Sequence, residues 1–381
     1  MGYKSLYILI WTTCMQATGM WALLHISSSP AWTSETLGVP LAYVAIFPAI
    51  SGGAAAIGSV FSANLISRWG TTNSLRVCLI TLIVGLIAQS FGNYSMAVLG
   101  AILIGLAYAL TNPAASALLT KIQTKRTNLV FSIKQSGVPF GAAAAMLWGS
   151  NASSQFEVWV TLPVVLLCTL ILTCPKVSEK IVLCARTGLL TVWSNPFLAR
   201  LLIVGMCFGA VQMIVLGSFP SLIELGFVSS TNSFLALSIG NALGLVGRIF
   251  WGLTADRLNS SEKTLAIIGL TTCILIALLL IDSSTAPFVF LLTGFVAVGW
   301  NGVFHAAIRI KLNDSTSAAT ATVMAYLFAS GLVGQIIFST FLDHFGPLAA
   351  LIVSLLFVSI GTLFAFSLAR NGLAKTELSD R

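Results

Sequence analysis

Charged residues are scarce in this sequence. Asp, Glu, Lys and Arg make up only 8% of its 381 residues, whereas soluble domains carry roughly 25%, and 57% of the residues are hydrophobic. Water cannot surround most of such a chain, so a soluble globular enzyme is excluded. The apolar runs are continuous and do not alternate with a period of two, which argues against a transmembrane β-barrel. The sequence therefore predicts an all-α membrane protein that crosses the bilayer repeatedly.

Several chemical signatures are also missing. The seven cysteines lack the paired spacing of a metal or disulfide framework, and the absence of a Gly-Lys dipeptide excludes a phosphate-binding loop for ATP. The three histidines are scattered, whereas a membrane enzyme needs clustered acids, histidines or an activated nucleophile. We therefore expect no catalytic residues, no cofactor, no metal site and no ATP-driven pumping within this chain.

Twelve apolar runs approach the ~20 residues that a membrane helix needs. The first six cover 6–25, 41–62, 75–91, 96–119, 129–149 and 158–174, and the second six cover 201–223, 234–254, 265–281, 287–308, 322–341 and 348–368. The longest polar connection separates the two sets. We therefore predict two six-helix bundles, 1–174 and 201–381, the second with a short cytoplasmic tail, joined by a cytoplasmic linker over 175–200.

The positions of lysine and arginine predict the orientation. Outside the apolar runs, these residues occur only at the termini and in alternate connections, and the six other connections contain none. Because cations near helix ends are retained on the cytoplasmic side, we expect both termini in the cytoplasm of a bacterial cell, in a multi-pass inner-membrane protein. The net charge of +8 then reflects topology and not binding to nucleic acid. Lys134 and Arg248 are the two cations inside apolar runs.

An internal repeat supports the division into halves. At a single offset of 189 residues, small, aromatic, polar and charged residues of the first half recur in the second. The matched pairs are Gly58 with Gly247, Phe61 with Phe250, Arg68 with Arg257, Gly105 with Gly294, and Asn112 with Asn301. Duplicated halves are typical of secondary transporters.

The chain resembles the major facilitator superfamily. Residues 67–70 (Ser-Arg-Trp-Gly) are similar to the superfamily signature after the second helix, with serine in place of the acid, and 252–257 (Gly-Leu-Thr-Ala-Asp-Arg) match its repeat, with Asn259 where a second glycine is usual. The resemblance implies twelve helices in two pseudo-symmetric six-helix bundles, alternating access, and a cytoplasmic gate. The gate residues would be Arg68, Asp256 and Arg257.

The same resemblance places the substrate between the halves, among helices one, four, seven and ten. These runs carry polar residues near mid-membrane, where exposure to hydrocarbon is costly. The candidates for substrate binding are Gln16, Asn112, Gln212 and Asn301.

Lys134 and Arg248 are the strongest candidates for binding a charged substrate. A cation at the bilayer centre costs about 2.5–3.5 kcal/mol, and up to Glu157 the first half offers no intramembrane carboxylate to Lys134. The stretch 247–253 resembles the eighth helix of monocarboxylate porters, in which an arginine holds the substrate carboxylate. We hypothesise that both cations bind an organic anion. The alternatives are a structural pair between Lys134 and Asp256, and a gate contact for Arg248.

Two further features leave the direction of transport open. His25, Glu224 and His305 are candidates for proton coupling, although residues near helix ends are ordinarily solvated. Residues 137–141 (Gly-Val-Pro-Phe-Gly) resemble a fragment of an antiporter motif, but small residues four apart, here and at Gly240 and Gly244, also permit close helix contacts.

The sequence thus predicts a monomeric secondary active transporter in a lipid bilayer. It moves a small organic anion, most simply a carboxylate, by alternating access, with protons as a candidate coupling ion. The alternative is a proton-driven exporter of amphipathic drugs or metabolites.

Overall fold

The structure is a computed structural model that describes residues 3–119, 133–149, 156–175, 192–228, 230–312 and 316–379. All regular elements in these ranges are helical, which confirms the predicted all-α class. Residues 129–132 of the fifth predicted run and 176–191 of the predicted linker lie outside the described residues.

The N-terminal helices follow the first six predicted runs. They are α1 (Tyr3–Leu24), α2 (Pro30–Leu37), the 3-10 helix η1 (Leu41–Tyr43), α3 (Ile46–Trp69), α4 (Thr71–Ser90), α5 (Tyr94–Leu119), α7 (Gly137–Gly149) and α8 (Phe156–Leu172). The short α2 lies in the connection between the first two predicted runs, whereas η1 covers the first residues of the second run, 41–62, ahead of α3.

The C-terminal helices follow the second six runs. They are α9 (Pro196–Gly217), α10 (Phe219–Glu224), α11 (Ser230–Arg257), α12 (Ser261–Ile281), the 3-10 helix η4 (Ser283–Thr285), α13 (Ala286–Ala297), α14 (Asn301–Leu312), α15 (Thr316–Phe345) and α16 (Pro347–Ser379). Asn195 caps α9 by accepting hydrogen bonds from the backbone N–H groups of Phe197 and Leu198.

Within the described ranges, nine helical segments are long and apolar enough to cross a membrane, and Val160–Leu172 forms a shorter apolar helix. The total of twelve crossings stays a prediction. Exposed apolar side chains recur every three or four residues along α12, as expected for a face in lipid. They are Ile267, Leu270, Ile274 and Leu278.

The tenth predicted run is not one continuous helix. It is interrupted at 298–300, between α13 and α14. Gly299 lies in the interruption, and glycine leaves helical backbone geometry at little cost in free energy. The side chains of Trp300 and Asn301 donate hydrogen bonds to Gln212 of α9. The predicted run 287–308 nevertheless lies within one candidate membrane span, Ser283–Ile308.

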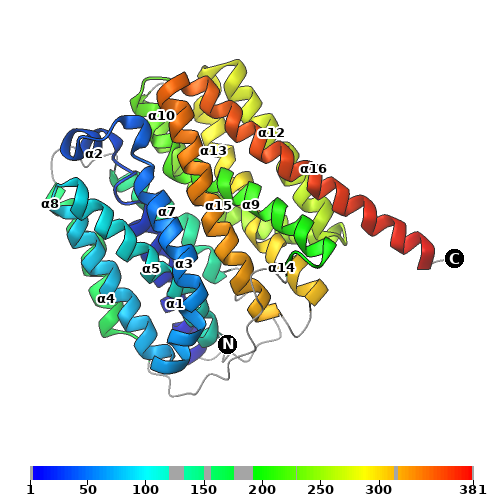
Figure 1. Cartoon of the computed structure of the whole chain (residues 1–381), viewed down its shortest axis with the longest axis horizontal. Helices are drawn as coiled ribbons and strands as arrows, with labels where there is room; N and C mark the ends of the chain where they lie inside the picture. Colours follow the sequence, from blue (N-terminus) through cyan, green and yellow to red (C-terminus); the bar gives the residue numbers. More distant parts are fainter. Residues whose placement is uncertain are drawn as a thin grey trace.

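The helices pack as two groups that meet along two seams (Figure 1). In the N-terminal group α3 and α4 pack on α5 and α1 packs on α7, while in the C-terminal group α11 packs on α13 and α9 on α15 and α16. Between the groups, α3 lies beside α15, and α7 lies beside α11. The short α10 packs on α2 and η1, at the end of the molecule away from the N-terminus (Figure 1).

Glycines allow the backbones of α1 and α7 to come into direct contact. A Cβ atom at Gly137 would lie 2.5 Å from the Thr13 carbonyl oxygen, and one at Gly141 would lie 2.0 Å from that of Ala17. The predicted close helix contact at these two glycines is thus present, and Gly240 contacts the Phe290 carbonyl in the same way.

Gly141→Ala is therefore expected to destabilise the protein, because its methyl group collides with backbone that cannot rotate away. Overpacking of this kind costs about 1–3 kcal/mol. Gly252→Ala is the matched control, since a Cβ atom there has nothing within 4 Å. Thermal unfolding in detergent measures both, and an equal melting temperature for the two variants would contradict the packing described.

Candidate functional site

Arg248 lies at the seam between α7 and α11, and only 5% of its surface is exposed. Its Nη1 donates to the backbone carbonyl of Gln135, just before α7. Its Nε donates over 3.4 Å to the carbonyl of Val298, in the interruption between α13 and α14. One guanidinium therefore connects three helical segments from both groups.

Lys134 is fully buried. Its Nζ donates to the side-chain oxygen of Asn112, on α5. Asp256 is exposed at the end of α11, and these two described residues form no ion pair with one another. The predicted alternative, a structural pair between Lys134 and Asp256, is therefore not made in this structure.

Several polar groups surround the two cations. Arg248 bonds to Gln135, which directly follows Lys134 in the chain, and the charges of both cations influence His305, on α14. Arg248 also interacts electrostatically with Tyr108, on α5. Among the described residues, neither cation has an acidic partner, so the cluster keeps an excess of positive charge.

Gln16 lies deep in the N-terminal group and is fully buried on α1. Its Nε2 donates over 2.7 Å to the hydroxyl oxygen of Tyr108, whereas its Oε1 has no hydrogen-bond partner. The Tyr108 ring packs edge-on against Phe328 of α15, with ring centroids 6.1 Å apart. Tyr108 thus links the polar interior of one group to the seam with the other.

Gln212 has the corresponding place in the C-terminal group, on α9. Its Oε1 accepts hydrogen bonds from Trp300 Nε1 at 2.9 Å and from Asn301 Nδ2 at 2.8 Å. These two donors flank the end of the interruption between α13 and α14. Gln212 therefore holds the start of α14. Both lone pairs of its amide oxygen are used by these two hydrogen bonds.

The chain matches the sequence profile of a known protein family. The sequence profile of the Major Facilitator Superfamily matches residues 6–328. The chain belongs to this superfamily. It is therefore a membrane transporter, and the superfamily membership agrees with its apolar helices. A comparison with curated protein sequences gives no match. The partial likeness to monocarboxylate porters stays a prediction.

In this major facilitator protein, the predicted substrate residues fall into three groups. Lys134, Asn112 and Arg248 lie together around the α7–α11 seam. Gln16 bonds to Tyr108, and Gln212 bonds to Asn301 within its own group. Sequence reasoning missed Tyr108, although it lies four residues before Asn112 and hence on the same face of α5.

The predicted coupling residues are not together. His305 is near the two cations, whereas His25 is fully buried directly after α1 and Glu224 ends α10. Partial burial, and then the negative charge of Glu35, raise the pKa of the Glu224 carboxyl above its usual range. A role in proton coupling stays a prediction for all three.

The predicted gate residues Arg68, Asp256 and Arg257 are exposed at the ends of α3 and α11. In the part of the chain that the structure describes, they form no ion pair with one another. The gate therefore stays a prediction.

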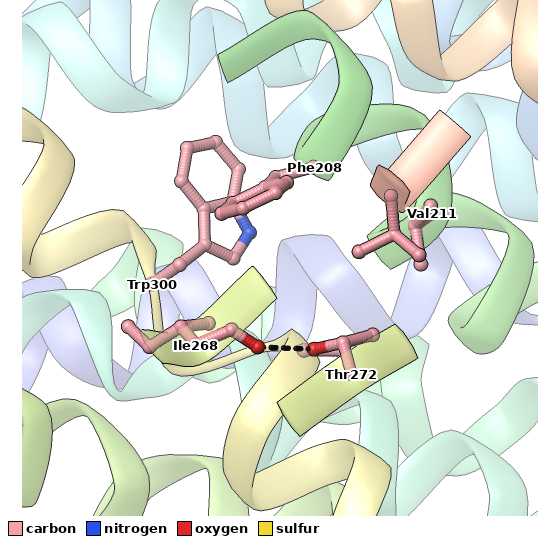
Figure 2. Close-up of a pocket in the computed structure, with 7 residues that line it drawn as sticks. Phe208, Val211, Ile268, Thr272 and Trp300 are labelled. Carbon is pink, nitrogen blue, oxygen red and sulfur yellow. Dashed lines mark hydrogen bonds between the residues drawn. The ribbon is translucent and has the colours of Figure 1, made fainter. Parts of the chain in front are cut away.

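A small apolar gap lies within the C-terminal group (Figure 2). Phe208 and Trp300 meet there edge-on, and Thr272 donates to the Ile268 carbonyl. The gap has room for no more than a water molecule. Its lining also includes Val211, Ala297 and Val358, and it offers no site for a substrate.

Proposed function

We propose that this major facilitator protein transports a small organic anion, with a carboxylate as the favoured class. The observation that carries the proposal is the burial of Lys134 and Arg248 at one seam, where Arg248 bonds to Gln135, the neighbour of Lys134 in the chain, with no acidic partner for either cation among the described residues. Backbone and amide oxygens accept hydrogen bonds from both cations but leave both charges uncompensated. A bound anion supplies the missing charge and removes part of the burial cost, which is about 2.5–3.5 kcal/mol for each cation at the bilayer centre.

The two cations also suit the geometry of alternating access. They reach the site from α11 and from the segment before α7, which belong to different groups. An anion between them is held by both halves at once. We further propose that the protein acts as a monomer in a bacterial inner membrane, with both termini in the cytoplasm and protons as the candidate coupling ion.

The test is a thermal-shift panel on the detergent-purified protein. Lactate and succinate are compared with glucose, alanine and tetraphenylphosphonium at equal ionic strength. A ligand at a hundred times its Kd stabilises the native state by about 2.7 kcal/mol, so a carboxylate is expected to raise the melting temperature. Stabilisation by tetraphenylphosphonium and by neither carboxylate would contradict the proposal and favour an exporter of amphipathic compounds.

A further inference from the structure

The carbonyl group that binds Arg248 lies four residues before a proline, which cannot donate to it. In an α-helix the carbonyl of Gln135 would accept from the N–H of the residue four positions later, which is Pro139. Proline has no N–H. The regular α-helix begins only at Gly137, and the N–H of Ser136 bonds instead to the Ile133 carbonyl. The Gln135 carbonyl is therefore left for a donor from another helix.

The second carbonyl that binds Arg248 also lies at a helix interruption. Val298 follows the last residue of α13, and α14 begins only at Asn301. Arg248 thus occupies two acceptors at interrupted helices, one in each helix group. The contact with Val298 lies within the C-terminal group, whereas the contact with Gln135 crosses between the groups.

Elsewhere along the described part of the α7–α11 seam, one further polar contact joins the two helices. Ser238 donates over 2.9 Å to the Ala143 carbonyl, and a Cβ atom at Gly244 would lie 3.0 Å from the Pro139 ring. A charge-assisted hydrogen bond is stronger than a neutral one, so the contact from Arg248 to Gln135 contributes most to the polar attraction across this seam.

We propose that Pro139 is a positioning residue that makes Arg248 a releasable tie between the two helix groups. Without substrate, Arg248 holds the Gln135 carbonyl and keeps α7 against α11. If the protein carries an anion, as proposed above, the anion competes for the same guanidinium and releases the carbonyl. Substrate binding would thus weaken the closed seam at the moment when the carrier must change conformation.

A double-mutant cycle tests the tie without any substrate. Pro139→Ala restores the N–H for Gln135, and Arg248→Gln removes the guanidinium. Spin labels at Trp69, which ends α3, and at Leu258, directly after α11, both exposed, report the separation of the groups on the side of Arg248 by pulsed electron resonance in a cysteine-free background. Each single variant is expected to raise the ratio of separated to closed molecules by about tenfold, the effect of losing one hydrogen bond to a charged group.

The decisive result is the combination. If both variants remove the same contact, the ratio of separated to closed molecules is no higher in the double variant than in Arg248→Gln alone. Additive effects, or no effect of Pro139→Ala, would overturn the tie. Pro139→Gly restores the same N–H and serves where the alanine variant folds poorly. Pro163→Ala, within α8 of the same group, is the matched control and should leave the distribution unchanged.

The two proposals fail separately. The double-mutant cycle is measured without any anionic ligand. If no carboxylate stabilises the protein in the thermal-shift panel, the result of the cycle is unchanged, and only the release of the contact by substrate is overturned. If the effects in the cycle are additive while a carboxylate raises the melting temperature in the panel, the tie is overturned and the proposed anion site stands.

Discussion

Arg248→Lys is expected to weaken carboxylate binding about tenfold to a hundredfold. Lysine keeps the positive charge but not the planar fork of donors that matches a carboxylate. Losing a hydrogen bond to a charged group costs about 1.5–3 kcal/mol, and every 1.4 kcal/mol is tenfold in affinity. The Kd from ligand titrations of the purified protein, or the KM of uptake into proteoliposomes, measures the change.

Two companion variants complete this prediction. Lys134→Gln removes the second charge while keeping a similar length, so it is also expected to weaken binding. Arg370→Lys is the matched control, because Arg370 is exposed on α16, far along the chain from the cluster. The anion site is wrong if Arg248→Lys and Lys134→Gln both retain wild-type uptake of every anion tested.

Gln212→Leu is expected to be strongly destabilising. The substitution removes the acceptor for both Trp300 and Asn301, which leaves two donors without a partner in the membrane interior. Each buried donor left unsatisfied costs about 1–3 kcal/mol. Because these bonds fix the start of α14, transport should fall together with the melting temperature.

Gln89→Leu is the control for this effect. Gln89 is also buried, on α4, but its amide oxygen already has no hydrogen-bond partner. The same change of side chain there removes no accepted bond, so the melting temperature should stay near that of the wild type. Equal losses in the two variants would show that hydrophobic substitution, and not the loss of the acceptor, causes the effect.

Much of the helical fold could be predicted because hydrocarbon leaves a membrane chain few alternatives. Backbone groups in the bilayer must be satisfied within each segment, so continuous apolar runs predict helices directly. The fold of the superfamily followed from the repeat and from signature residues such as Asp256 and Arg257. The interruption at 298–300 could not be predicted in this way, because apolar residues continue through it and its contacts with Gln212 and Arg248 are made only in the folded structure.

The sequence predicted which charged residues form the candidate site, but not which groups they contact. Lys134 and Arg248 stood out because buried cations are rare in apolar runs. That Lys134 bonds to Asn112, and Arg248 to two backbone carbonyls, depends on how α5, α11 and the segment before α7 meet in space. Pro139 was visible in the sequence, yet only the structure shows which carbonyl it leaves free.

The most direct test of the anion site is counterflow in proteoliposomes. Vesicles loaded with unlabelled lactate or succinate are diluted into the labelled compound, and exchange is compared between wild type and the Lys134→Gln/Arg248→Gln variant. We predict saturable exchange of a carboxylate by the wild type and its loss in the folded double variant. Unchanged carboxylate exchange by the double variant would contradict the claim that these two buried cations bind the substrate.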